Sequence, residues 1–184
     1  MTNAHPFLRL VLLALVSVLG ACSSSAPPEA AEPITLDAPA AVLDGERYLE
    51  YRVGVHIDAP PAKVWALLIA AGDYPRWNST VLEIDGDIAE GEDIELVSTV
   101  DPDRRFELSV GGVVPEQRMT WSDGGRAFRG ERTFTLEARD DGTTDFTMKE
   151  VFTGSMMNMI EPKLPDFRES FDAFASDLRV AAEQ

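Results

Sequence analysis

The sequence predicts an α+β domain in which a curved antiparallel sheet of about seven strands wraps round a long C-terminal helix. Three patterns carry this prediction: a clean alternation of apolar and polar residues near position 50, a series of shorter alternating segments after it, and an aromatic stripe close to the C-terminus. An antiparallel sheet with one apolar face must bury that face against another layer. The C-terminal helix with its aromatic stripe is the element expected to cover this apolar face.

The first strand is expected over Tyr48–Ile57. All odd-numbered residues from Leu49 to Ile57 are apolar, whereas Glu50, Arg52 and His56 occupy the other face. A two-residue period of this kind is typical of a half-buried strand.

Two short helices are expected next, because Asp58–Pro61 ends the strand and is followed by Val64, Trp65 and the compact segment Asp73–Ser79. Six further strands are expected near Leu82–Ile84, Ile94–Leu96, Phe106–Val110, Met119–Trp121, Gly130–Ala138 and Thr144–Thr153. The last two are separated by Asp140–Gly142, a strong hairpin-turn signal.

The closing helix is expected from about Leu164. Phe167, Phe171, Phe174 and Leu178 recur at i, i+4, i+7 and i+11. This spacing places them on one apolar stripe of a helix.

The N-terminus is typical of a secretory signal peptide, expected over residues 1–21. Leu10–Leu19 is an apolar run of the length of a signal-peptide core, too short to span a bilayer as a helix. The run ends in Leu19-Gly20-Ala21-Cys22, which resembles the lipobox of bacterial lipoproteins. Cys22 is then the lipid-attachment residue. The alternatives are an ordinary secretory signal with a chance cysteine, or an uncleaved anchor.

Lipid attachment would make the protein a membrane-anchored component of the bacterial cell envelope. Ser23, and not Asp, follows the cysteine; by resemblance to other lipoproteins, this implies the outer membrane, facing the periplasm. Residues 22–44 are rich in Ala, Pro, Glu and Ser and are expected to form a flexible tether. Residues 45–184 are expected to form one folded domain.

Charge and cysteine content exclude several functions. The formal net charge is −16, so nucleic acid is not an expected partner. Cys22 is the only cysteine, which excludes an intramolecular disulfide and a cysteine metal site. His56 would be the only histidine left after signal cleavage, and it is expected at the surface. No metal and no cofactor is expected.

Several short motifs, in order, resemble the START-like (SRPBCC) superfamily, in particular its polyketide cyclase/dehydrase and lipid-transport branch. They are Val55–Pro60 with Val64-Trp65, Tyr74–Asn78, Gly86 and Gly91, Met119–Trp121, Gly142–Thr144 and Glu150–Gly154, followed by the terminal helix. The resemblance implies a helix-grip fold with an internal hydrophobic cavity. Family members include carriers of hydrophobic ligands, cyclases, dehydratases and regulators, so the fold does not settle the function.

One charged pair is expected in the cavity. Pairing across the Asp140–Gly142 turn places Leu136 opposite Phe146, Phe134 opposite Met148, and Arg132 opposite Glu150. Arg132 and Glu150 therefore fall among apolar residues, where a buried charge needs a partner. They either form a structural salt bridge or anchor a ligand's polar head, or they serve as acid and electrostatic stabiliser in a reaction.

Eight further residues complete the cavity candidates, either as ligand contacts or as plain core: Trp77, Phe106, Met119, Trp121, Phe134, Met148, Met156 and Met157. The two methionines of the loop before the terminal helix either form a lid or simply pack. No catalytic residue is assigned. Binding of a hydrophobic small molecule or lipid is the leading hypothesis. The alternatives are a cyclase or dehydratase acting on an apolar, polyketide-like substrate, and an interaction domain without ligand.

Overall fold

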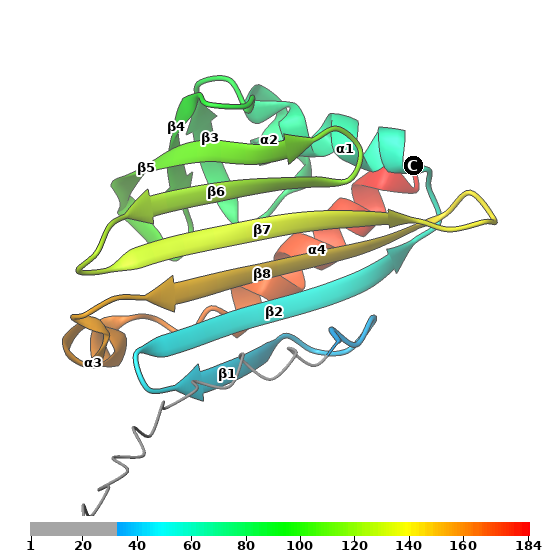
Figure 1. Ribbon diagram of the computed structural model, residues 1–184. Helices are drawn as coiled ribbons and strands as arrows, with labels where there is room; N and C mark the ends of the chain where they lie inside the picture. The colour runs from blue at the N-terminus through cyan, green and yellow to red at the C-terminus, as the bar shows by residue number, and fades with distance from the viewer. Residues whose placement is uncertain (1–32) are drawn as a thin grey trace, which may run out of the picture. The chain divides into compact units, whose positions relative to one another are not determined.

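A computed structural model describes residues 33–184, in which an eight-stranded antiparallel sheet curves over a long C-terminal helix (Figure 1). The expected signal peptide, Cys22 and the first part of the expected tether lie outside the described residues. The strands are β1 Ala41–Gly45, β2 Tyr48–Ile57, β3 Val81–Asp85, β4 Asp93–Ser98, β5 Asp101–Val114, β6 Arg118–Gly124, β7 Arg129–Ala138 and β8 Thr144–Thr153. Their order in the sheet is β1-β2-β8-β7-β6-β5-β4-β3.

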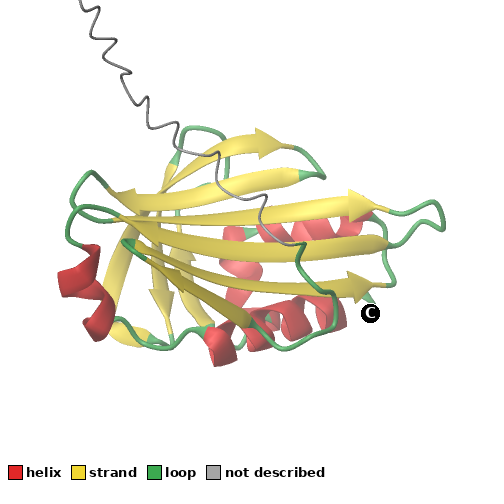
Figure 2. Cartoon of the chain, turned by 60° about the horizontal axis from the view of Figure 1, so that its bottom comes forward, coloured by secondary structure: helices red, strands yellow, loops and turns green. Residues whose placement is uncertain are grey.

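The helices are α1 Pro61–Ile69, α2 Tyr74–Trp77, α3 Met157–Ile160 and α4 Arg168–Ala182, with short 3-10 turns at Ala71–Asp73 and Glu161–Lys163. α1 and α4 lie on one side of the sheet, and its other face is free of helices within the described residues (Figure 2). The predicted α+β, helix-grip arrangement is therefore confirmed. No helix of this part of the chain is both long enough and apolar enough to cross a membrane.

The sheet has one more strand than expected. β1 pairs with β2 from Ala41↔Arg52 to Gly45↔Tyr48, and all its residues are exposed. Residues 33–44, which were expected to belong to a flexible tether, instead include most of β1 and residues bonded to α4. An edge strand with little burial lacks the strong alternation by which the other strands were recognised.

The eight residues before β1, Pro33–Ala40, form a strap that is bonded to α4. The Asp37 carboxylate pairs with the Arg179 guanidinium at 2.9 Å, and the Ala40 backbone N–H donates to the Asp172 carboxylate at 2.6 Å. These bonds hold the N-terminal end of the described chain against the helix that packs on the inner face of the sheet.

The strap also covers part of the outer face of β2. A methyl group on Gly54 would come within about 3 Å of Leu36 and Ile34. The absence of a side chain at this position therefore lets the strap lie close to the strand.

The hairpin of β7 and β8 has the predicted register: Leu136 faces Phe146, Phe134 faces Met148, and Arg132 faces Glu150. The aromatic stripe of α4 packs against it. Phe174 lies at the centre of this core, with ring-centroid distances of 5.8 Å to Phe134 and 6.4 Å to Phe146.

The terminal helix begins at Arg168, four residues later than expected. Leu164 is extended (φ −71°, ψ 140°), because the proline that follows disfavours helical backbone at the residue before it. The buried stripe therefore starts at Phe171, and Phe167 belongs to the segment that approaches the helix.

Candidate functional site

A cavity of about 430 Å³ lies between the inner face of the sheet and α4. Its size is within the range of small-molecule sites. The apolar lining residues are Val81, Leu96, Val100, Phe106, Leu108, Trp121, Phe128, Gly130, Met148, Phe152, Leu164, Pro165, Phe167, Phe171 and Phe174. The polar lining residues are Thr80, Ser98, Asp101, Arg104, Asp123, Arg132, Glu150, Lys163 and Ser170.

Aromatic side chains connect the sheet to the helical side of this cavity. Phe128 stacks on Phe152 at 5.7 Å, and Phe152 stacks on Phe167 at 5.6 Å. Lys163 lines the same cavity at the end of a 3-10 turn and is exposed. The segment leading into α4 therefore contributes one wall, which includes Leu164 and Phe167, two residues that were expected within the helix itself.

Arg132 and Glu150 form an ion pair in the cavity wall. Arg132 Nε donates to Glu150 Oε2 at 2.9 Å, and Nη2 donates to the same oxygen at 2.5 Å. The two side chains are only 18% and 16% exposed. The Arg132 guanidinium also lies 5.2 Å from the centre of the Phe171 ring on α4, within the range of a cation–π contact.

The pair belongs to a row that crosses four strands. Trp121 on β6 faces Arg132 on β7, which faces Glu150 on β8, which faces Tyr51 on β2. Trp121 and Tyr51 are buried. The charged pair is thus enclosed by aromatic rings on both sides of its row, which reduces its contact with solvent water and strengthens the attraction between its charges.

Hydrogen-bonding capacity remains on both members of the pair. Both guanidinium donors converge on Oε2, so within the described residues neither Glu150 Oε1 nor Arg132 Nη1 has a hydrogen-bond partner. A carboxylate oxygen accepts, and a guanidinium N–H donates. Within residues 33–184, the ion pair therefore keeps one free acceptor atom and one free donor atom in the cavity wall.

The structure brings half of the ten cavity candidates to this cavity: Phe106, Trp121, Arg132, Met148 and Glu150. Met119 and Phe134 face each other on β6 and β7 and are fully buried, outside the cavity lining. Trp77 packs edge-on against Phe174 at 5.7 Å and contributes to the core.

The two loop methionines do not line the cavity. The Met156 backbone N–H donates to the Ala127 carbonyl at 2.9 Å, which fixes the start of α3 to the turn between β6 and β7. Met156 is 41% exposed, and Met157 is fully buried. Leu164 and Pro165, which follow α3 and the 3-10 turn, line the cavity instead. Pro165 was the feature of the sequence that could have indicated an extended segment here, because a proline disfavours helical backbone at the residue before it.

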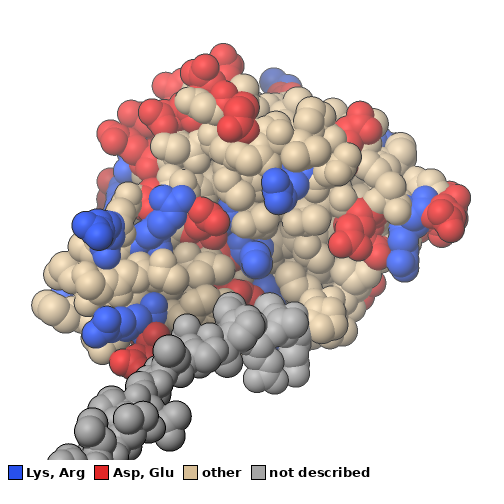
Figure 3. Space-filling view, viewed as in Figure 1, with Lys and Arg blue, Asp and Glu red and all other residues tan. Residues whose placement is uncertain are grey.

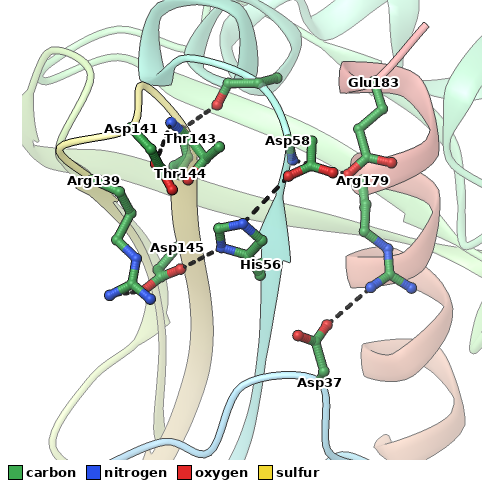
Figure 4. A network of polar contacts seen from close by, with 11 residues as sticks. Asp37, His56, Asp58, Arg139, Asp141, Thr143, Thr144, Asp145, Arg179 and Glu183 are labelled. Carbon is green, nitrogen blue, oxygen red and sulfur yellow. Dashed lines mark hydrogen bonds and ion pairs between the residues drawn. The ribbon is translucent and has the colours of Figure 1, made fainter.

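His56 belongs to a separate network on the outer face of the sheet (Figure 4). Its Nδ1 lies 2.8 Å from Asp145, its Nε2 lies 3.4 Å from Asp58, and Arg139 pairs with Asp145 at 3.2 Å. The hydrogen bond with Asp145 raises the pKa of His56 above its ordinary value. The His56 side chain is 33% exposed, which agrees with a place outside the cavity.

Acidic side chains gather over the β3–β5 part of the molecule (Figure 3). A second depression there has polar walls that include Asp85, Asp93, Glu95 and Glu107. Among residues 33–184, no three His, Cys, Asp or Glu side chains come together in an arrangement that could hold a metal ion. The cavity with apolar walls is therefore the better candidate for binding an organic ligand.

Comparison with known proteins agrees with this geometry. A family model described as polyketide cyclase/dehydrase and lipid transport matches residues 49–179. No curated protein matches the sequence.

Solved structures share the fold at low sequence identity. A START superfamily protein from Mycobacterium smegmatis has a TM-score of 0.55 and 15% identity, over 73% of this chain and 97% of that one. The di-domain ARO/CYC protein BexL from the BE-7585A biosynthetic pathway has a TM-score of 0.57 and 13% identity, over 77% and 52%. A conserved protein of unknown function from Enterococcus faecalis has a TM-score of 0.57 and 13% identity, over 79% and 77%.

Proposed function

Because the chain belongs to the polyketide cyclase/dehydrase and lipid transport family, we propose that it binds a hydrophobic small molecule or lipid in the cavity between the sheet and α4. The observation that carries this proposal is a cavity of about 430 Å³ with mainly apolar walls and the Arg132–Glu150 pair set into them. An apolar body would fill the cavity, and the pair would hold its polar end.

The residues of the cavity favour binding over catalysis. No histidine or cysteine is among the described residues that line it. An open cavity also favours a ligand-binding domain over an interaction domain that fills its interior with its own side chains.

We further propose that the domain is held on a membrane by acyl chains on Cys22, in the bacterial envelope and on the periplasmic side of the outer membrane. The lipobox-like segment Leu19–Cys22 and Ser23 after it support this. The membrane and the hydrophobic ligand are the proposed partners. Several acyl chains hold a protein on a bilayer without a spanning helix.

Mass spectrometry of the small molecules retained by the purified protein tests ligand binding. Leu108→Trp adds bulk inside the cavity and should abolish retention. The matched variant Glu107→Trp, on the exposed neighbour in the same strand, should keep it. Equal retention by both variants, or no retained molecule in the parent, contradicts the proposal.

Fractionation of cells tests the anchor. Cys22→Ser should release the protein from membranes and abolish labelling by a fatty-acid probe, because the serine hydroxyl cannot replace the thiol as lipid acceptor. A parent protein that is never labelled would show that Cys22 is not acylated.

A cyclase or dehydratase is the second candidate, favoured by the ion pair inside the cavity, which is suited to acid and electrostatic roles. Liquid chromatography with mass spectrometry of an added apolar substrate separates the two functions. A carrier returns the substrate unchanged, a dehydratase returns a molecule lighter by one water, and a cyclase returns an isomer of the same mass with a different retention time.

A further inference from the structure

We propose that the cavity selects an uncharged amphiphile, whose head group both donates and accepts a hydrogen bond, over ligands with an anionic or a cationic head. Hydroxyl, amide and undissociated carboxylic acid groups belong to this class. The inference rests on the proposed function, and it names the chemical class of the ligand.

The first argument is that the charges of the pair are already neutralised. Arg132 places two donors on one oxygen of Glu150. An incoming carboxylate would find the guanidinium occupied and a second carboxylate beside it. An incoming ammonium would find the Glu150 carboxylate occupied and the Arg132 guanidinium beside it. A charged head would therefore lose its hydration without gaining an unopposed counter-ion.

The second argument is the unused capacity of the same pair. Among the described residues, Glu150 Oε1 has no donor and Arg132 Nη1 has no acceptor. A neutral group such as a hydroxyl can donate to the first or accept from the second. Both side chains line the cavity, where Glu150 keeps 16% and Arg132 18% exposure.

The third argument concerns the remaining charges of the lining. Besides the pair, the cavity is lined by two basic residues, Arg104 and Lys163, and two acidic residues, Asp101 and Asp123. Arg104 and Lys163 are exposed, so water and salt screen their attraction for an anion. Asp101 and Asp123 are half-buried, and the Asp123 carboxylate accepts a hydrogen bond from the Gly130 backbone N–H. The lining carries equal numbers of opposite charges, so its formal net charge favours neither sign.

The test compares three ligands with the same apolar chain: decanol, decanoate and decylamine, at neutral pH. The full chain carries Cys22→Ser in every sample, so that no acyl chain competes for the cavity. The indole N–H resonance of Trp121, on the cavity wall, reports binding at this site in two-dimensional NMR spectra. Decanol should bind more tightly than either charged ligand, by about tenfold or more.

Each single variant of the pair should change which ligand binds most tightly, and the two variants should favour ligands of opposite charge. Glu150→Gln leaves a positive wall and should move the preference to decanoate. Arg132→Gln leaves a negative wall and should move it to decylamine. The double variant restores a neutral wall and should again prefer decanol, which also shows that the substitutions themselves do not destroy the site.

Matched controls lie one residue away on the opposite face of the same two strands. Glu131→Gln and Lys149→Gln make the same changes in net charge without touching the cavity lining, and should leave the order unchanged. A parent that prefers a charged ligand, or single variants that do not reverse the order, would overturn the inference while the proposed function stands. Failure of all three ligands to shift Trp121 would overturn the proposed function and the inference with it.

Discussion

Two polar networks include residues of the β7–β8 hairpin, one on each face of the sheet, and they differ in how their members are exposed to water. Arg132 and Glu150 point into the cavity, among aromatic rings, and depend on each other. Near the turn, Arg139, Asp145 and His56 lie on the outer face (Figure 4), and the Arg139 side chain is 54% exposed.

The contrast comes from the alternation of side chains along a strand, which sends neighbouring residues to opposite faces. A charge on the inner face has exchanged water for a single protein partner. On the outer face Asp145 is buried as well, but it has two charged or polar partners, Arg139 and His56, whose side chains keep 54% and 33% exposure to water. Removing one member should therefore have very different consequences in the two networks.

The largest expected effect is that of Glu150→Ala. This change leaves Arg132 without its counter-ion in a largely desolvated wall, and should lower the free energy of unfolding by about 3–5 kcal/mol. Arg132→Met combined with Glu150→Leu should cost clearly less, because no unpaired charge remains. Denaturant titration of the three proteins measures both values. If the free energy of unfolding falls as much in the double variant as in Glu150→Ala, the pair is not desolvated, and the contrast between the inner and outer networks is wrong.

A smaller effect is expected for Asp145→Ala on the outer face. Asp145 itself is buried, but its partners Arg139 and His56 keep access to water after the change. The loss should be about 1–2 kcal/mol, mainly from hydrogen bonds to a charged group. The same titration checks it. A loss as large as that of Glu150→Ala would mean that the outer network is as isolated from water as the inner pair.

The smallest effect is a pH dependence that belongs to the outer network alone. The hydrogen bond with Asp145 raises the pKa of folded His56 above about 6.5, its ordinary value. The stabilisation from protonated His56 is therefore fully present below about pH 6.5 and is lost as the pH rises through the folded-state pKa. Thermal midpoints should fall over this range, and His56→Gln should flatten the dependence. A midpoint of the parent that rises with pH would contradict this sign.

Local sequence patterns predicted most of the fold. The two-residue period located seven strands, and the turn at Asp140–Gly142 set the register that brings Arg132 to Glu150. β1 was missed because Val42 and Leu43 lie on an exposed edge, where burial imposes no pattern. The strap was missed because its bonds to Asp172 and Arg179 join residues more than a hundred positions apart.

The candidate site was only partly predictable for the same reason. Phe106, Trp121 and Met148 could be assigned from strand parity, whereas the wall formed by Lys163 and Leu164 depends on how an irregular segment packs. The methionines Met156 and Met157 were expected either to form a lid or to pack. The backbone bond of Met156 to the β6–β7 turn and the full burial of Met157 favour packing.

The strap also limits the length of the linker between Cys22 and the folded domain. With Asp37 and Ala40 bonded to α4, the chain between Cys22 and the folded unit ends at Pro33. Eleven residues fully extended span at most about 40 Å, roughly half of what a tether ending at Asp44 would allow. If the protein is anchored through Cys22 as proposed, a linker of this length keeps the domain close to the membrane that holds it. Its ligand would then have to be taken up and released at that surface, or handed to a protein that comes to it.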